Sequence, residues 1–440
     1  MKEFPKVLIA GVDAWRKDGP SDTLPNIFSC WDKEKVALVY TRSNNPDSDV
    51  SNNFFQISEN KVLKSIFRPW IKTGKTAENH QSVISKDLII EQKRYGKAHK
   101  KHSEFMTLCR EIVWLLGNWK SKELRDFVNK FNPDVLFLPI YNKWYMCSLE
   151  LFLIRITKKP IATYYVDDDY SYDSCQGILS YLHRFVLRKY VKKLMVKSRE
   201  SFVIADMVKN EIDKTFNKDS KILTKGVDFT TSEYSAKKIK YPIKFVYTGN
   251  LLIGRDSTLL LIADIINKLD NTGEKISLDI YSQTELSENV LQKLNNGNSH
   301  FHGNIPREKI EEIQKNADVL IFAEAISGKN SYAAKMSFST KLTDYMKSGK
   351  CIFAVGKQDI SPIHYLKKYD AAIVSTNEQE IYENIKSLLE EPKLIENYGS
   401  KAFNCAKQNH DKESIDKRFC TVLFELWRSN YNGEDSKETL

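Results

Sequence analysis

Short apolar runs alternate with longer stretches of helical periodicity along the first half of the chain. Four runs rich in β-branched residues lie at positions 7–12, 36–41, 134–139 and 161–166. Runs of this length, bounded by polar segments, are typical of parallel strands buried on both faces. The pattern predicts a first Rossmann-like α/β domain within residues 1–235.

After a polar, turn-like stretch the alternation starts again. Six more apolar runs follow, with helical segments between most of them, at 243–249, 276–282, 300–303, 317–323, 351–356 and 371–375. They predict a second doubly wound parallel sheet within residues 241–410. We expect residues 411–440 to form a helix that returns to the N-terminal domain and ends in a polar tail.

Helices are expected directly after several of these strands. One runs from about Asp256 to Leu269, a second opens at Pro306, and a third opens near Thr340 and stops at Gly349. Proline suits the first turn of a helix, and glycine suits its end. A further helical region is predicted within residues 86–130, where Phe105, Leu108, Ile112, Leu115 and Leu116 recur at helical intervals.

Composition narrows the class of protein. The 440 residues are 41% hydrophobic, which is enough for two cores, and no apolar run is long enough to span a bilayer. The seven cysteines are scattered, without a pair or a histidine cluster that would hold zinc. We therefore expect a cytoplasmic protein with reduced thiols and no structural metal.

The net charge of +10 is concentrated in the N-terminal half. Residues 61–130 are basic, and residues 184–199 carry seven basic side chains and no acidic one. The helix from Leu182 mixes basic and apolar residues, as a helix lying on a membrane surface does, although a helix packed on a sheet with a solvated basic face has the same pattern. No nucleic-acid-binding motif is present, so we expect an anionic membrane or a lipid-linked pyrophosphate instead.

Candidate chemistry follows the first strand of the second domain. Thr248, Gly249 and Asn250 end this strand, and Gly254 and Arg255 lead into the next helix. Ligands of open parallel sheets bind beyond the carboxyl ends of the strands, where helix N-termini offer free amides. Glycine allows close backbone approach and arginine can bind a phosphate through two hydrogen bonds, although a tight turn with a surface arginine would look the same.

A second group follows the strand at 317–323. Ser337, Ser339, Thr340 and Lys341 place hydroxyls and an ammonium at a helix start, as a diphosphate requires. Asp344 lies one turn further on, where it could accept hydrogen bonds from ribose hydroxyls. Alternatively, Thr340 caps the helix and Asp344 favours its positive end.

One further turn completes the predicted donor site. Gly303, Asn304 and Ile305 would present backbone groups and one apolar side chain to the edge of a nucleobase, or form an ordinary loop.

The motifs together resemble the C-terminal domain of glycosyltransferases of the GT-B fold, specifically the GT4-like (group 1) family found in bacterial polysaccharide biosynthesis. The resemblance lies in FVYTGNLLIGRDS (245–257), HFHGNIP (300–306), ADVLIFAEA (317–325) and, most specifically, SFSTKLTDYMKSGKCIFAVG (337–356). It implies two Rossmann-like domains facing a cleft, with a nucleotide-diphosphate-sugar donor bound by the C-terminal one.

Site roles follow from this resemblance residue by residue. Arg255 and Lys341 match the family's phosphate-binding cations, Ser339 and Thr340 its phosphate-binding loop, and Asp344 the ribose-binding position, where the family usually has glutamate. Because two cations and a helix N-terminus already neutralise the leaving diphosphate, no metal or other cofactor is expected.

The sequence departs from the family at Met336, which occupies a position that is usually acidic. Glu324, in the preceding loop, is a candidate substitute for that acidic residue. This departure leaves open how the hydroxyls of the sugar are held.

The N-terminal domain offers candidates for the acceptor side. Related proteins have an acidic pair after the strand at 161–166, so Asp167 and Asp168 are candidates for lining the acceptor site and for catalysis, although either carboxylate could simply cap a turn. With Asp169 they also form a D-x-D pattern, which binds a metal in the other large glycosyltransferase class. Asp13 and Trp15, after the first strand, are further acceptor-side candidates.

The sequence thus predicts a retaining hexosyltransferase at the inner face of the membrane. It would move a sugar from a nucleotide-diphosphate-sugar to a glycan or lipid-linked glycan in cell-surface polysaccharide assembly. Two alternatives remain: a nucleotide-sugar epimerase of the same architecture, and a GT-B subunit that binds nucleotide but has lost catalysis.

Overall fold

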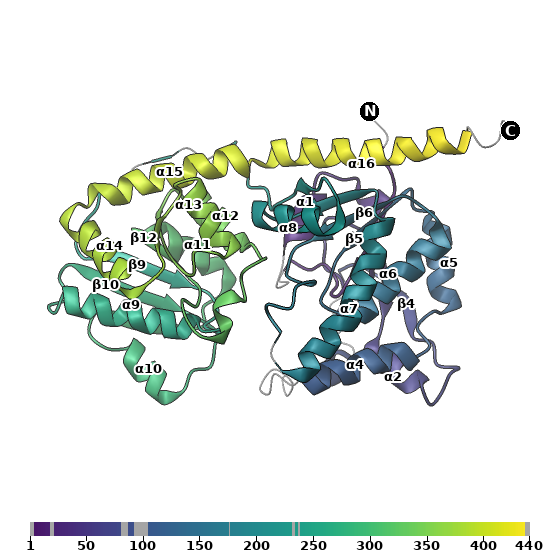
Figure 1. Ribbon diagram of the computed structural model, residues 1–440, viewed down its shortest axis with the longest axis horizontal. Coiled ribbons are helices and arrows are strands. Elements are labelled where there is room, and N and C mark those ends of the chain that lie inside the picture. The colour runs from purple at the N-terminus through teal and green to yellow at the C-terminus, as the bar shows by residue number, and fades with distance from the viewer. Residues whose placement is uncertain are drawn as a thin grey trace. The chain divides into compact units, whose positions relative to one another are not determined.

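The computed structural model describes residues 4–17, 22–80, 87–91, 104–175, 177–230, 234–235 and 238–435 (Figure 1). It divides into two compact units. Unit 1 comprises Met1–Ile204, Val208–Thr224 and Asp416–Leu440, and unit 2 comprises Ala205–Met207 and Lys225–Ile415. The first division, at 224/225, precedes the expected bounds of 235 and 241, and the second, at 415/416, follows the expected 410/411 by five residues.

Unit 1 is built on an eight-stranded sheet in the order β4-β3-β2-β1-β5-β6-β7-β8. Its strands are β1 (Val7–Gly11), β2 (Val36–Tyr40), β3 (Asn53–Ile57), β4 (Gly74–Ala77), β5 (Val135–Pro139), β6 (Ile161–Tyr165), β7 (Glu200–Val203) and β8 (Lys221–Ile222). All pairs are parallel except β3 with β4.

The four strands predicted for this domain are confirmed as β1, β2, β5 and β6, whereas four others escaped prediction. The predicted parallel sheet has one antiparallel strand, β4, at its edge. The residues of β4, GKTA, are mostly exposed and therefore lack the apolar run that marks a buried strand.

Helices cover the sheet of unit 1. They are α1 (Thr23–Phe28), α2 (Glu59–Ser65), α4 (Glu104–Leu116), α5 (Lys122–Phe131), α6 (Trp144–Thr157), α7 (Ile178–Lys197) and α8 (Asp206–Phe216). The predicted helical region at 86–130 contains α4 and α5, whereas its residues 86 and 92–103 lie outside the described ones.

The last helix, α16 (Lys412–Asp435), adds an aromatic side chain to the core of unit 1. The ring of Phe419 packs edge-on against the rings of Phe28 and Phe137, with centroids 5.1 and 5.7 Å away. Aromatic pairs in this geometry are favourable beyond the area they bury. The expected polar tail, residues 436–440, lies outside the described part of the chain.

Unit 2 carries a six-stranded parallel sheet in the order β11-β10-β9-β12-β13-β14. Its strands are β9 (Ile243–Thr248), β10 (Ile276–Tyr281), β11 (Ser299–Gly303), β12 (Val319–Ala323), β13 (Cys351–Val355) and β14 (Ile373–Ser375). All six predicted runs form strands. Strand order reverses between β9 and β12, and the carboxyl ends of strands at such a switch point are where open α/β sheets bind ligands.

The helices of unit 2 are α9 (Arg255–Leu269), α10 (Glu288–Leu294), α11 (Arg307–Asn316), α12 (Thr340–Lys347), α13 (Ser361–Lys368), α14 (Glu378–Glu390) and α15 (Lys393–Asn409). Those expected after Pro306 and near Thr340 are confirmed, with Pro306 at the N-cap rather than inside the first turn. None of the helices in the described part of the chain is long and apolar enough to cross a bilayer.

Candidate functional site

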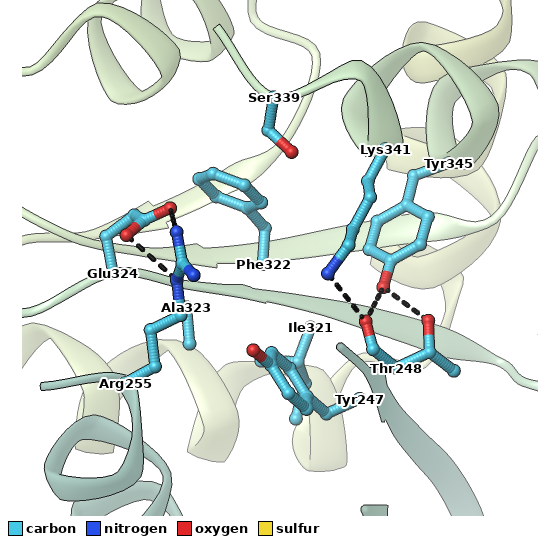
Figure 2. A pocket seen from close by; sticks show the side chains of 10 residues that line it. All are labelled: Tyr247, Thr248, Arg255, Ile321, Phe322, Ala323, Glu324, Ser339, Lys341 and Tyr345. Carbon is cyan, nitrogen blue, oxygen red and sulfur yellow. Dashed lines mark hydrogen bonds and ion pairs between the residues drawn. The ribbon is translucent and has the colours of Figure 1, made fainter. Parts of the chain in front are cut away.

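A small pocket lies in unit 2 at the carboxyl ends of β9 and β12, where the strand order reverses (Figure 2). Two helix N-termini, those of α9 and α12, contribute side chains to it. Its lining residues are Tyr247, Thr248, Arg255, Ile321, Phe322, Ala323, Glu324, Ser339, Lys341 and Tyr345. The pocket thus combines two cations and one carboxylate with two phenols.

Arg255, the first residue of α9, is held by Glu324 at the end of β12. The guanidinium donates from Nε to Oε2 at 3.0 Å and from Nη2 to Oε1 at 2.8 Å, and its Nη1 donates to the side-chain oxygen of Asn250 at 2.7 Å. Burial disfavours the charge of Arg255, but the contacts with Glu324 outweigh it and raise its pKa. The arginine is therefore a fixed, permanently charged group in the pocket.

Gly254 makes this arrangement possible. It caps α9 with φ of +81°, a conformation in which side chains are strained, and a Cβ added there would come within 2.9 Å of the Ala325 Cβ. The glycine therefore brings the start of α9 against the end of β12, where Arg255 reaches Glu324.

Lys341, in the first turn of α12, approaches from the opposite side of the pocket (Figure 2). Its Nζ donates to the Thr248 carbonyl at 3.1 Å. Burial, followed by the nearby charge of Arg255, lowers its pKa to about 8. Two cations that repel each other in a partly buried pocket favour an anion between them.

Gly249 gives Lys341 its room. A Cβ on this residue would lie 2.1 Å from the lysine Nζ, closer than any real contact. The glycine predicted from sequence for close backbone approach therefore lies beside the ammonium group itself.

Ser339 forms the N-cap of α12, and its side chain makes no capping hydrogen bond to the helix. Its hydroxyl projects towards the pocket in Figure 2, above Phe322. Thr340 is the first residue of the helix rather than its cap, and Ser337 lies two residues before the cap. The start of α12 therefore presents a hydroxyl and helix amides beside Lys341.

Asp344 lies one turn further along α12 and outside the pocket lining. Both of its carboxylate oxygens accept hydrogen bonds from the Lys225 ammonium, each at 3.0 Å. A ribose could use the same carboxylate only by sharing it with Lys225.

Gly303, Asn304 and Ile305 follow β11, two strands away from β9 in the same sheet. They share the carboxyl edge of the sheet with the pocket but do not line it. The Gly303 carbonyl already accepts a hydrogen bond from the Ser282 amide at 2.9 Å. The side chain of Asn304 is exposed and is the polar side chain of this turn that a base could reach.

At the end of β6 in unit 1, the three consecutive aspartates have different surroundings. The Asp168 carboxylate accepts hydrogen bonds from the Ser171 amide, at 2.8 Å, and from the Ser171 hydroxyl. It also lies 3.8 Å from the guanidinium of Arg184. Asp169 is buried, and burial together with Asp167 raises its pKa to about 8. Asp167 is exposed, although nearby protein atoms raise its pKa against the opposing effect of Lys143. Asp168 is thus engaged in holding the loop, and Asp167 is the accessible carboxylate.

Asp13 and Trp15 follow β1 in the same unit. Asp13 is half-buried, with an oxygen 3.6 Å from Arg42 Nε. Trp15 is buried, and its ring stacks on Phe28 with centroids 6.0 Å apart. Trp15 belongs to the hydrophobic core, so we do not include it in the acceptor site.

Three residues in or near the two candidate sites were not predicted from the sequence. Tyr247 and Tyr345 line the pocket, and the Tyr345 hydroxyl lies 3.0 Å from the Thr248 hydroxyl. In unit 1, Glu150 is fully buried and its oxygens have no hydrogen-bond partner among the described residues, so burial raises its pKa well above the usual range. Only Tyr345 had a sequence signal, its position beside Asp344.

Within the described ranges, no three histidine, cysteine or carboxylate side chains are grouped so that they could hold a metal ion. None of the seven cysteines, all of which are described, forms a disulfide.

Comparisons with known proteins agree with this geometry. Residues 242–404 match the model of the family described as glycosyl transferases group 1. A comparison with curated proteins found no match.

Solved structures resemble the whole chain at low sequence identity. HepE of Anabaena, crystallised with UDP, is 11% identical, covers 96% of this chain and 100% of its own, and has a TM-score of 0.60. A sucrose-phosphate synthase from Thermosynechococcus elongatus is 10% identical over 96% and 99% of the two chains, with a TM-score of 0.59. A glycosyltransferase from Rickettsia africae is 10% identical over 96% and 98%, with a TM-score of 0.58. The chain therefore has the two-unit GT-B fold, and its residues 242–404 match the family of group 1 glycosyl transferases.

Proposed function

We propose that this protein transfers a sugar from a nucleotide-diphosphate-sugar to a glycan or lipid-linked glycan acceptor, in the assembly of a cell-surface polysaccharide. The observation that carries the proposal is the convergence of Arg255 and Lys341 on one pocket at the switch point of unit 2. Retention of anomeric configuration is part of the proposal and is supported only by the family resemblance.

The pocket suits a diphosphate leaving group. Negative charge grows on the leaving phosphate as the bond to the anomeric carbon breaks, so donors that face it lower the barrier. Arg255 supplies a planar pair of donors, Lys341 supplies an ammonium, and the first turn of α12 supplies amides and a helix dipole. These groups together perform the charge neutralisation for which other glycosyltransferases use a metal, so we propose a metal-independent reaction.

We propose two roles for Glu324. In the present structure both of its oxygens hold Arg255. We propose that it positions this arginine and that one oxygen also faces the sugar, in place of the acidic side chain that is missing at Met336.

Uracil is the first nucleobase to test. HepE, which shares the fold, was crystallised with UDP and with UDP-glucose. We propose that the base lies near Asn304 and the ribose near Asp344.

On the acceptor side, we propose Asp167 as the group that takes the proton from the attacking hydroxyl. Its exposed position after β6, which an acceptor hydroxyl could reach, supports this role. We also propose a cytoplasmic location, supported by the scattered positions of the seven cysteines, and the basic stretches of unit 1 support contact with a membrane.

The test is thermal stabilisation of the purified protein by UDP, GDP, ADP and CMP, each in EDTA and then with manganese. A ligand at a hundred times its dissociation constant stabilises the folded state by about 2.7 kcal/mol. We expect one nucleoside diphosphate, UDP first, to raise the Tm in EDTA. A shift only with manganese would favour a D-x-D metal site, and no shift would overturn the donor site.

Product analysis separates the remaining alternatives. An epimerase would rearrange or hydrolyse the donor without any acceptor, and a non-catalytic subunit would bind nucleotide but transfer nothing to a broad panel of acceptors. Met336, buried at a position that is usually acidic, is the feature that motivates the second alternative.

A further inference from the structure

Helix α4 of unit 1 turns several apolar side chains to solvent and a carboxylate to the protein interior. Its only buried residues are Glu111 and Trp114, whereas Phe105, Leu115 and Leu116 are exposed. A surface helix of a globular protein ordinarily turns its apolar stripe to the core and its charges to water. The apolar stripe of α4 therefore faces outward.

Specific contacts of Glu111 fix this orientation. Its carboxylate accepts hydrogen bonds from the Trp144 and Tyr145 amides at 3.0 and 2.9 Å, at the N-terminus of α6, and lies 3.1 Å from His183 Nε2 on α7. A buried carboxylate with three partners is costly to expose or to replace. The outward orientation of the apolar residues is therefore specified by the fold.

Adjoining segments add apolar side chains to the same end of unit 1. Helix α4 packs against α2 and α7 (Figure 1), through Arg110 and Glu59 on one side and Glu111 and His183 on the other. Six side chains there are 62–87% exposed, and we call them the α4 surface: Phe67, Trp70, Phe105, Leu115, Leu116 and Ile178. Clustered exposure of this kind marks an interaction site.

The charges beside the α4 surface are positive. Lys64 and Arg68 flank Phe67, and Lys189, on α7, lies 4.3 Å from the ring of Phe185. Glu59 of α2 and Glu111 of α4 are turned to protein partners, α7 contains no acidic residue, and Glu104, beside Phe105, is the remaining carboxylate of α4. Tryptophan and phenylalanine flanked by lysine and arginine are the composition of a segment that lies at the surface of an anionic bilayer.

We propose that the α4 surface docks on an anionic lipid bilayer, with Trp70, Phe67 and the apolar stripe of α4 entering the interface. This proposal rests on the proposed function, since a lipid-linked acceptor has to be reached at a membrane. A second copy of this chain is a poorer occupant, because it would place two basic surfaces of a protein with net charge +10 against each other.

The test is co-sedimentation of the full chain with vesicles of phosphatidylcholine alone or mixed with phosphatidylglycerol. We expect binding to the mixed vesicles that weakens with salt, since each cation near an anionic surface contributes about fivefold to the partition coefficient. The double variants Phe67→Ser/Trp70→Ser and Leu115→Ser/Leu116→Ser should each lower partitioning at least about tenfold. Tyr382→Ser, which changes a partly exposed side chain of unit 2, is the control.

Unchanged partitioning of both double variants would overturn the proposal. So would a dimer, seen by size exclusion with light scattering, that dissociates in the same variants, because the occupant would then be a second copy. Nucleotide-induced stabilisation is measured on the same proteins. If vesicle binding fails while stabilisation persists, only the docking surface is wrong, and the converse result removes the donor site alone.

Discussion

The carboxyl ends of the strands carry mainly cations in the sheet of unit 2 and carboxylates in the sheet of unit 1. In unit 2, the edge is dominated by Arg255 and Lys341, with Glu324 held against the arginine. In unit 1, the corresponding edge carries the carboxylates Asp167 and Asp169, whose pKa values are raised by their surroundings.

This difference assigns a task to each unit. Paired cations stabilise an anion, whereas a carboxylate with a raised pKa accepts a proton more readily than an ordinary carboxylate does. A sugar transfer needs both, a stabilised leaving phosphate and a deprotonated acceptor. Under the proposed function, unit 2 would bind the donor and unit 1 would remove the proton.

Removing either cation of unit 2 should give the largest effect. We expect Lys341→Ala and Arg255→Ala each to lower kcat/KM about a hundred- to a thousandfold, as loss of a donor to a developing anion does. Steady-state kinetics with the donor identified by thermal stabilisation measures this. Lys268→Ala, an exposed lysine of the same helix as Arg255, is the matched control. Near-normal turnover of both variants would remove the assignment of the donor site.

The unit 1 aspartates should separate catalysis from structure. We expect Asp167→Asn to lower transfer about a hundredfold, the lower end for loss of a general base, with nucleotide affinity unchanged. Asp168→Asn should instead lower the Tm, because Asp168 holds Ser171 and Arg184. Calorimetry and turnover measured on both proteins test this, and the reverse assignment would follow if only Asp168→Asn lost activity while keeping its Tm.

Sequence reasoning was strongest where chemistry follows a buried strand. The six strands of unit 2 follow from apolar runs, and the close approach at Gly249 follows from the residue directly after one of them, whereas Arg255 and Lys341 are placed by the predicted helix starts. Such positions are readable because the end of a strand in a parallel sheet fixes where the next residues lie.

Contacts between distant segments could not be read in this way. The pairing of Asp344 with Lys225, 119 positions apart, and the burial of Glu150 depend on how loops and helices pack. The outward stripe of α4 was hidden for the same reason, since periodicity shows that Phe105, Leu115 and Leu116 share a helix but not which way they face.

A smaller effect is expected from Gly249→Ala, which tests the geometry of the pocket rather than its charge. The added methyl group has to displace the Lys341 ammonium, so we expect a ten- to thirtyfold loss of kcat/KM, mostly through KM. The double variant with Lys341→Ala should lose little more than Lys341→Ala alone, because the effect passes through that lysine. Additive losses would mean that the methyl group acts elsewhere.

The smallest effect concerns pH. Because burial lowers the pKa of Lys341 to about 8, its charge is lost as pH rises through that value, and nucleotide affinity should fall less than about tenfold between about pH 7 and 9. Affinity falls because bound phosphate raises the pKa of Lys341, and the fall stays below the full tenfold only as far as the bound lysine also loses part of its charge by about pH 9. Isothermal titration across this range measures the effect, and Lys341→Arg, which stays charged, should be flat.

The contribution of Lys341 to the free energy of unfolding should change in the opposite direction to nucleotide affinity, over a range that begins near pH 8. Between about 8 and the ordinary lysine value of 10.5, the unfolded chain binds the proton that folded Lys341 has released, so its contribution to the free energy of unfolding rises with pH. Affinity that falls while this contribution rises, both abolished in Lys341→Arg, would identify one buried lysine as the cause. Affinity and stability that fall together would point instead to general unfolding at high pH.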